Sequence, residues 1–304
     1  MTINSHDFKP ITIDDRDIFQ KIYKRHPITH SESSFATLFC WKHYAHTEVF
    51  FTRKNLIART TINGHVIYRA PIGAADESVL RDVMDLACAT DHNQPLLLFE
   101  EDQIAAYQAL YPHLVFREDR NFFDYVYRTE TLATLPGKDF LTIRKQLHKF
   151  HRTMHPSTED VSAENMHEIL EFLQKWCEWH ECDKYEILKH ESIALHTALE
   201  YFNALQLSGI LIRSGIDGSI IGLSIYEELS PDTLVVHYEK GLHEAEGIYK
   251  ELVNALAIRM KGRYQFIDRE SDMGAPGLRD SKSRYRPDHF RKLFYLDLDT
   301  VAPA

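Results

Sequence analysis

Acids, bases and cations gather in the last third of the chain, close to a predicted strand over 233–239. Alternate side chains of a strand share one face, so His237 and Glu239 are expected to be neighbours. A carboxylate or an imidazole in such a place can accept the proton that an amine or hydroxyl loses when it attacks an ester. Glu239 is therefore the candidate catalytic base, with His237 assisting it. The open alternative is a structural hydrogen-bonded pair, because ion-pair networks and catalytic sites look alike in sequence.

A set of nearby cations suits a second task, which is to hold an anionic donor group such as a phosphate. Glu270 can orient one of these cations or recognise a substrate ammonium, and Tyr249 and Tyr285 are candidate walls of the cleft. The open alternative is a solvated surface stripe, neutralised by the aspartates around it. The cations are Lys240, Arg269, Arg279 and Lys282.

A second group of cations lies on or beside a predicted helix over 140–151 and stands out against the formal net charge of -10. Such a patch can hold tRNA through its phosphates, because contacts to the nucleic-acid backbone supply affinity without base readout. A solvated helix face is the alternative. The group comprises Lys138, Arg144, Lys145, Lys149 and Arg152, with His148 and His151.

The composition is that of a folded protein rather than a disordered one, with 44% hydrophobic and 26% charged residues. A chain of 304 residues is long for one hydrophobic core and comfortable for two. The acidic total excludes a protein that coats nucleic acid over its whole surface. No apolar run approaches the roughly 20 residues of a membrane-spanning helix. The start lacks the basic and apolar parts of a signal peptide, so we expect a soluble, cytoplasmic protein.

Cysteine usage predicts reduced thiols and no metal centre. Four cysteines in a chain of this length fit free thiols better than a disulfide framework. Cys177, His180 and Cys182 lie close together, but zinc sites normally show a closer cysteine pair and a second pair elsewhere. Residues five apart on a continuous helix also point to different faces. These residues are therefore expected to be ordinary helix residues.

Hydrophobic periodicity predicts two similar halves, each opening with helices and passing into a meander of strands. Asn63-Gly64 in the first half and Asp217-Gly218 in the second are predicted to make matching hairpin turns. Both halves therefore read as copies of one α+β unit. The first half has predicted strands over 48–52, 56–61, 66–70 and 96–99, and helices over 77–89 and 103–111. The second has predicted helices over 163–181, 193–205 and 247–260, and strands over 209–213, 219–226, 233–239, 264–267 and 294–298.

Several separated motifs are spread along most of the chain. They are Phe123-Asp124-Tyr125-Val126-Tyr127-Arg128, Leu135-Pro136-Gly137-Lys138, Arg144-Lys145 with Phe150, His237-Tyr238-Glu239-Lys240, Gly247-Ile248-Tyr249 with Asn254, and Arg269-Glu270-Ser271-Asp272-Met273-Gly274 with Leu278-Arg279, Lys282, Tyr285 and Pro287. In their order along the chain these motifs resemble the phosphatidylglycerol lysyltransferase C-terminal-domain family. Two positions depart from the pattern, because Asp268 stands where asparagine is expected and Arg284 stands where serine is expected.

The resemblance implies an α+β fold of two tandem GNAT-like domains, each a mixed, mostly antiparallel sheet flanked by helices. The expected N-terminal domain covers 1–130, and the expected C-terminal domain covers 131–304 and carries the active site.

The best-understood members of this family transfer an amino acid from aminoacyl-tRNA to a membrane lipid. The resemblance therefore implies an acyltransferase that moves an aminoacyl group to an amine or hydroxyl acceptor, either a small molecule or a lipid-like one. Acetyl-coenzyme A is the alternative donor, but a phosphate-binding loop would have only Gly241 and Gly247, with Glu244 and Glu246 repelling a diphosphate. A noncatalytic ligand-binding module on the same fold is the second alternative.

Overall fold

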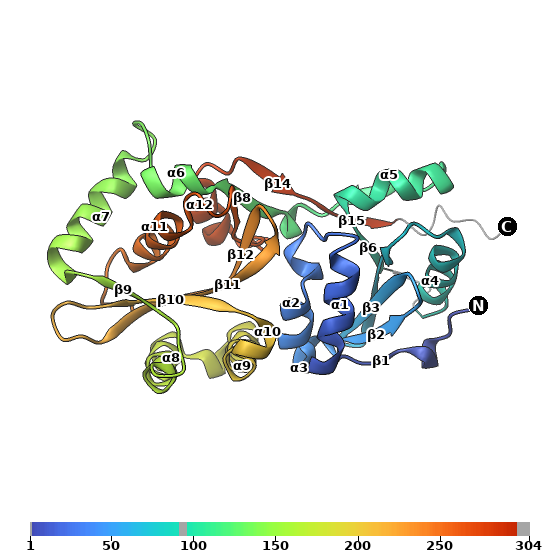
Figure 1. Cartoon of the computed structure of the whole chain (residues 1–304), viewed down its shortest axis with the longest axis horizontal. Coiled ribbons are helices and arrows are strands. Elements are labelled where there is room, and N and C mark those ends of the chain that lie inside the picture. Colours follow the sequence, from blue (N-terminus) through green and yellow to red (C-terminus); the bar gives the residue numbers. More distant parts are fainter. Residues whose placement is uncertain (1, 91–95, 297–304) are drawn as a thin grey trace. The chain divides into compact units, whose positions relative to one another are not determined.

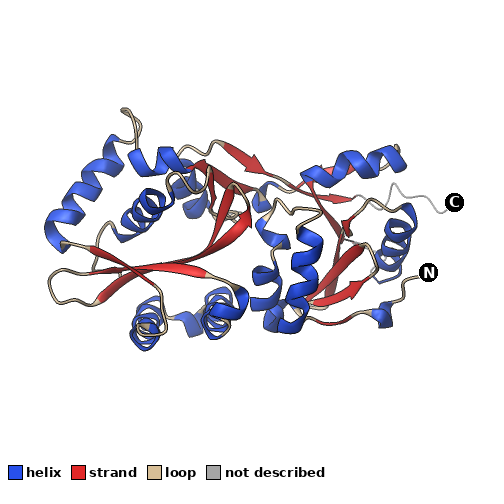
Figure 2. Cartoon of the chain, viewed as in Figure 1, coloured by secondary structure: helices blue, strands red, loops and turns tan. Residues whose placement is uncertain are grey.

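The computed structural model describes residues 2–90 and 96–296, which form two compact units (Figure 1). In each unit, helices flank a sheet (Figure 2). The first unit comprises the chain up to Asp124, Ser271–Gly274 and the segment from Arg291 onward. The second comprises Tyr125–Glu270 and Ala275–Phe290. The boundary expected between residues 130 and 131 is observed after Asp124, and the chain also returns to the first unit at Ser271–Gly274 and again from Arg291.

The sheet of the first unit runs in the order β1-β2-β3-β4-β6-β15-β7, with β5 beside β3. Neighbours are antiparallel except β4 and β6, which pair in parallel. The predicted strand over 294–298 is β15 as far as Leu296, and the remainder lies outside the described residues. The strands are β1 (Lys9–Pro10), β2 (Glu48–Phe51), β3 (Asn55–Ile62), β4 (His65–Arg69), β5 (Ile72–Gly73), β6 (Leu96–Glu100), β7 (Phe116–Glu118) and β15 (Leu293–Leu296).

The predicted hairpin turn at Asn63-Gly64 is confirmed. Both residues have left-handed backbones, with φ of 52° and 82°. Two consecutive positive φ values match the right-handed twist of the flanking strands, which is why asparagine and glycine favour this turn. The turn fixes the register of β3 against β4, with Ile62 opposite His65.

Helices of the first unit cover its sheet through apolar side chains at helical spacing. Leu80 and Val83 of α4 are fully buried and pack with Leu97 and Phe99 of β6 in one hydrophobic core. The helices are α1 (Arg16–Tyr23), α2 (Phe35–Cys40), α3 (Lys42–Ala45), α4 (Glu77–Thr90) and α5 (Glu101–Leu110).

The sheet of the second unit runs in the order β14-β8-β13-β12-β11-β10-β9. β12 and β13 pair in parallel, whereas β13–β8, β12–β11, β11–β10 and β10–β9 are antiparallel. The predicted mixed, mostly antiparallel sheets are thus confirmed. The strands are β8 (Asp124–Arg128), β9 (Ser157–Asp160), β10 (Ser208–Arg213), β11 (Ile220–Ser230), β12 (Thr233–Gly241), β13 (Phe266–Asp268) and β14 (His289–Arg291).

Helices cover both faces of β10 and β11, with α8 and α9 on one side and α7 and α11 on the other (Figure 1). On the α11 side the approach is close, since a Cβ on Gly222 or Gly241 would lie within 2.6 Å of Ile248 side-chain atoms. The helices are α6 (Thr129–Thr134), α7 (Leu141–Met154), α8 (Met166–His180), α9 (Glu186–Glu200), α10 (Phe202–Leu205), α11 (Ile248–Met260) and α12 (Pro276–Ser283).

Two local predictions in the second unit are wrong. The helix expected over 193–205 begins at Glu186 as α9, because the residues before Ala194 are exposed or half-buried and add no fully buried apolar side chain to the pattern. Asp217-Gly218 does not make a two-residue turn. Instead, the N–H of Ser214 donates to Ser219 O at 2.9 Å across a longer loop, in which Gly218 alone has a positive φ.

The expectation of reduced thiols is wrong for Cys177 and Cys182, which form a disulfide with their Cα atoms 5.1 Å apart. α8 ends at His180, and Glu181 has a left-handed backbone with φ of 51°. The helix is therefore not continuous across the pair, and the turn returns Cys182 to Cys177. Cys40 and Cys88 are free thiols.

Within the described parts of the chain, no helix combines the length and the apolar character needed to cross a bilayer.

Replacing both disulfide cysteines, as Cys177→Ser with Cys182→Ser, is expected to lower the free energy of unfolding by about 2 kcal/mol, because the crosslink restricts the unfolded chain. Urea unfolding without reductant measures this change. Reduced wild type should behave as the double variant does, and Cys88→Ser, at a half-buried free thiol, should stay close to wild type. A double variant as stable as the wild type would contradict the prediction.

Candidate functional site

β12 and β13 separate soon after they pair. Their parallel register runs only from Thr233 with Phe266 to Val235 with Asp268. Beyond that point, within the described residues, no main-chain hydrogen bonds join the last residues of β12 to the chain after β13. The space between these two segments is therefore filled by side chains. Strand ends that part in this way can place polar groups without disrupting the core.

A β-bulge lies at His237. Tyr226 pairs with Val236 and Ile225 pairs with Tyr238, so His237 is the extra residue of β12. The bulge reverses the alternation that follows it, and Glu239 therefore lies on the same face as Val236. The expectation that His237 and Glu239 are neighbours on one face is wrong.

His237 is instead held between two glutamates. Its side chain is 5% exposed, with Nε2 lying 2.9 Å from Glu227 and Nδ1 lying 2.8 Å from Glu270. Burial opposes the charged imidazolium, but hydrogen bonds and charge attraction from both carboxylates outweigh it and raise the pKa of His237 to about 10. At neutral pH both ring nitrogens therefore carry protons, and His237 has no lone pair with which to assist a base. Glu270 is likewise occupied by this contact.

Glu239 pairs with Arg269 across the gap between the strands. The two side chains are 14% and 10% exposed, and Arg269 Nη2 donates to Glu239 Oε2. Burial opposes the charge of Arg269, but Glu239 and the surrounding tyrosine hydroxyls raise its pKa. Among the described residues, Glu239 Oε1 and Arg269 Nε and Nη1 are buried without a hydrogen-bond partner. Leaving buried polar atoms without a hydrogen bond costs free energy, and a ligand that bonds to them would remove that cost.

A cavity of about 340 Å³ opens beside Arg269. Arg269, Tyr249 and Tyr285 line it, so the structure brings together one predicted cation and both predicted cleft walls. The Arg269 guanidinium lies 5.2 Å from the centre of the Tyr285 ring. Burial raises the pKa of Tyr285 to about 12, so its hydroxyl remains a proton donor. The other lining residues are Asp139, Thr142, Ile143, Gln146, Lys250, Ser281, Arg284 and Arg286.

Lys250 and Arg284 make this cavity cationic. Burial, and then the neighbouring charge of Arg284, lowers the pKa of Lys250. Within the described residues, neither side chain forms a hydrogen bond or an ion pair. Arg286, by contrast, lies 3.8 Å from Asp139. The cavity therefore presents two cations without ion-pair partners among the described residues, Lys250 and Arg284, next to the buried nitrogens of Arg269.

Lys240 lies on the opposite face of β12 from Arg269. Its side chain is 5% exposed, its Nζ lies 2.6 Å from Glu191 of α9, and it sits 4.0 Å from the centre of the Trp176 ring. Burial lowers its pKa. Lys240 and Arg269 therefore do not form the joint anion site that their sequence positions predict.

The two predicted cations of α12 do not line the cavity either. Lys282 Nζ donates to the carbonyl oxygens of Arg269 and Glu270, at 2.5 Å and 3.1 Å, and thereby ties α12 to the chain after β13. Arg279 is half-buried on the same helix.

The basic helix over 140–151 is observed as α7, and part of its charge is already neutralised. Arg144 donates to the carbonyl oxygens of Leu135 and Gly137, and Lys149 lies 2.6 Å from Glu246. His151 Nε2 lies 2.6 Å from Glu251. Lys149 and His151 are exposed despite these contacts, as are Lys138, Lys145, His148 and Arg152.

Sequence reasoning missed Lys250 as a cavity residue and noted Arg284 only as a departure from a pattern. The sequence did offer a signal for both residues. Lys250 directly follows the predicted cleft wall Tyr249, and Arg284 directly precedes the predicted cleft wall Tyr285. At the start of α11 and the end of α12, neighbouring side chains can share one cavity.

Sequence comparison matches the chain over residues 23–296 to the family described as "Phosphatidylglycerol lysyltransferase, C-terminal". The α+β units define a tandem GNAT-like protein. The chain belongs to the phosphatidylglycerol lysyltransferase C-terminal family. A comparison with curated protein sequences finds no match.

Solved structures share the fold. A conserved protein of unknown function from Bacteroides thetaiotaomicron VPI-5482 is 27% identical, with a TM-score of 0.84 over 95% of this chain and 98% of that one. L-PGS from Bacillus licheniformis is 14% identical, with a TM-score of 0.61 over 93% and 91%. FemX is 10% identical, with a TM-score of 0.54 over 95% and 96%.

His237→Gln is expected to remove a pH-dependent part of the stability. Because the folded pKa of about 10 exceeds the ordinary value of 6.5, the contribution of His237 is complete below pH 6.5 and is lost as pH rises towards 10. The wild type should exceed the variant by on the order of 3 kcal/mol at pH 6, with the gap closing by pH 10. Urea unfolding across this range measures the difference.

His167→Gln is the matched control, because the His167 side chain is 86% exposed. Its difference from wild type should remain small at every pH. A gap between wild type and His237→Gln that stays constant from pH 6 to pH 10 would show that His237 is not held protonated.

Proposed function

We propose that the protein transfers an aminoacyl group from aminoacyl-tRNA to an amine or hydroxyl acceptor. The observation that carries the proposal is the cavity lined by Lys250, Arg269 and Arg284 in a chain of this family. Lys250 and Arg284 form no ion pair among the described residues, which favours an anionic ligand, and guanidinium groups match the geometry of phosphate oxygens. The phosphates near the acceptor end of a tRNA meet that requirement.

Arg269 also suits the stabilisation of charge during transfer. Attack of the acceptor nitrogen or oxygen on the ester carbon places negative charge on the carbonyl oxygen. The Nε–H and Nη1–H groups of Arg269 can donate hydrogen bonds to that oxygen and stabilise its charge. The bond between that carbon and the ribose oxygen then breaks. Glu239 Oε1 takes the proton of the acceptor and returns it to the leaving ribose oxygen. No covalent enzyme intermediate is needed.

Acetyl-coenzyme A is the alternative donor, and the start of α11 gives it less support. The N–H of Ile248 already donates to Ala245 O, and the N–H groups of Lys250 and Glu251 donate to Gly247 O. These first-turn amides are therefore engaged within the chain, whereas a diphosphate site needs them pointing at the ligand.

Arg284→Ala is expected to weaken binding of aminoacylated tRNA about tenfold and to reduce the salt dependence of that binding by about one phosphate contact. Fluorescence anisotropy at several salt concentrations measures both quantities, with deacylated tRNA and acetyl-coenzyme A as competitors. Arg53→Ala, at an exposed arginine of the first unit, is the control and should bind as the wild type does. Equal binding by all proteins, or stronger competition by acetyl-coenzyme A than by deacylated tRNA, would overturn the proposed donor.

Glu239→Gln is expected to slow transfer at least about 100-fold while donor affinity stays nearly unchanged, because the amide cannot accept the proton. Release of label from bulk radiolabelled aminoacyl-tRNA measures transfer, with 2-phenylethylamine and phosphatidylglycerol vesicles as separate acceptor probes. Glu200→Gln, at an exposed carboxylate of α9, is the control. Wild-type rates in Glu239→Gln would remove Glu239 from the base role. Saturable donor binding with no release by the wild type would favour the noncatalytic module.

A further inference from the structure

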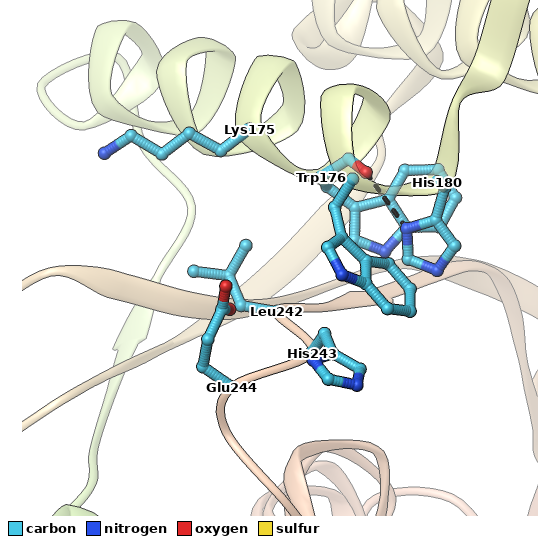
Figure 3. A pocket seen from close by; sticks show the side chains of 7 residues that line it. Lys175, Trp176, His180, Leu242, His243 and Glu244 are labelled. Atoms are coloured by element: carbon cyan, nitrogen blue, oxygen red, sulfur yellow. Dashed lines mark hydrogen bonds between the residues drawn. The ribbon is translucent and has the colours of Figure 1, made fainter.

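A second cavity of the same unit, of about 230 Å³, lies between the end of α8 and the loop that follows β12. Figure 3 shows Lys175, Trp176 and His180 on the helix, facing Leu242, His243 and Glu244 on the loop. Trp179 completes its lining. None of these residues lines the cationic cavity, and none has a role in the transfer described above.

Aromatic rings form one wall of this cavity. Trp176 stacks on His180 with ring centres 3.9 Å apart, and Trp179 stacks on His243 at 4.3 Å. The ring centres of Trp179 and His180 also lie 4.3 Å apart, edge to face. Because the rings already contact one another, no slot remains between them for an intercalated base. Trp179 is nevertheless 51% exposed, so an indole surface is open to a ligand.

Two hydrogen-bond acceptors complement the rings. His180 Nδ1 lies 2.9 Å from the carbonyl oxygen of Trp176, and a carbonyl can only accept, so Nδ1 carries the proton. In the neutral ring Nε2 is therefore an acceptor. Glu244 supplies an exposed carboxylate, and within the described residues it forms no hydrogen bond or ion pair. Lys175 extends away from Trp176 and His180 in Figure 3. Lys240, outside the lining, already occupies a face of Trp176 at 4.0 Å, and Glu244 is the carboxylate among the lining residues.

The cavity is built on a closed loop of chain. The disulfide between Cys177 and Cys182 encloses Trp179 and His180, so both rings belong to a restrained segment. A restrained wall loses less conformational freedom when a ligand binds.

Tyr249 joins this cavity to the cationic one. The Trp176 indole N–H donates to the Tyr249 hydroxyl at 3.3 Å, and Tyr249 itself lines the cationic cavity. One hydrogen-bonded pair of side chains therefore stands between the two spaces.

We propose that the aromatic cavity binds an organic ammonium. π faces, a histidine lone pair and a carboxylate together select a positively charged N–H donor. This binding does not depend on the proposed function. The ligand class is a primary amine carried on an apolar stem, because Leu242 and the rings offer apolar contact.

Binding of 2-phenylethylamine, followed by tryptophan fluorescence and isothermal titration calorimetry on the full chain at neutral pH, tests this inference. Wild type should bind it saturably, and the neutral isostere 2-phenylethanol should bind about tenfold more weakly. Glu244→Gln and His180→Phe should each weaken amine binding about tenfold. Glu244 is exposed, so its variant keeps the test valid even where His180→Phe disturbs folding.

Glu178→Gln is the matched control, because Glu178 is exposed on α8 and does not line the cavity. Equal affinity for 2-phenylethanol, unchanged amine affinity in Glu244→Gln, or binding of adenosine monophosphate in place of the amine would overturn the inference. Absence of amine binding with intact binding of charged tRNA would defeat this inference alone. Intact amine binding with no binding of charged tRNA would defeat the proposed donor alone.

Discussion

The parting of β12 from β13 is the constraint on which the second unit depends. Where the parallel ladder stops, main-chain hydrogen bonds no longer hold the strands together, and the buried pair of Glu239 and Arg269 spans the space. Removing two charges from water is costly, and a buried pair offsets that cost only with good geometry and further hydrogen bonds. Here some of the polar atoms of the pair stay unsatisfied among the described residues. The structure therefore keeps a polar site with unsatisfied groups at the strand ends, as functional sites often do.

The bulge at His237 determines which helix each later residue of β12 meets. After the bulge, Glu239 lies on the α11 side with Arg269, whereas Lys240 lies on the other side with Glu191 of α9. One short strand thus serves two different environments, one beside a cationic cavity and one beside an aromatic cavity. The protonated His237 stabilises this arrangement, because it links β12 to Glu227 of β11 and to Glu270 beyond β13.

Regular elements could be predicted from the sequence because their signals are local. The Asn63-Gly64 turn depends on two residues that tolerate positive φ, and the strands around it depend on alternation. The family motifs also placed Tyr249, Tyr285 and Arg269, which line one cavity. Sites assembled from those same motifs were harder to predict, because proximity along the chain did not show which side chains share a face.

The failures have specific physical causes. Strict alternation along β12 predicted His237 beside Glu239, but a bulge of one residue reversed it. Helical geometry separated Cys177 from Cys182, but the helix ended between them and a left-handed Glu181 closed the disulfide. Each error arose where a regular element was interrupted.

A double-mutant cycle on Glu239→Gln and Arg269→Met tests most directly whether this buried pair holds the site together. Urea unfolding of the wild type, both single variants and the double variant gives the coupling free energy. Each single variant should lose on the order of 3 kcal/mol, and the double variant should lose far less than their sum, because removing both partners leaves no uncompensated buried charge. Additive losses would show that the two side chains act independently and would contradict the account.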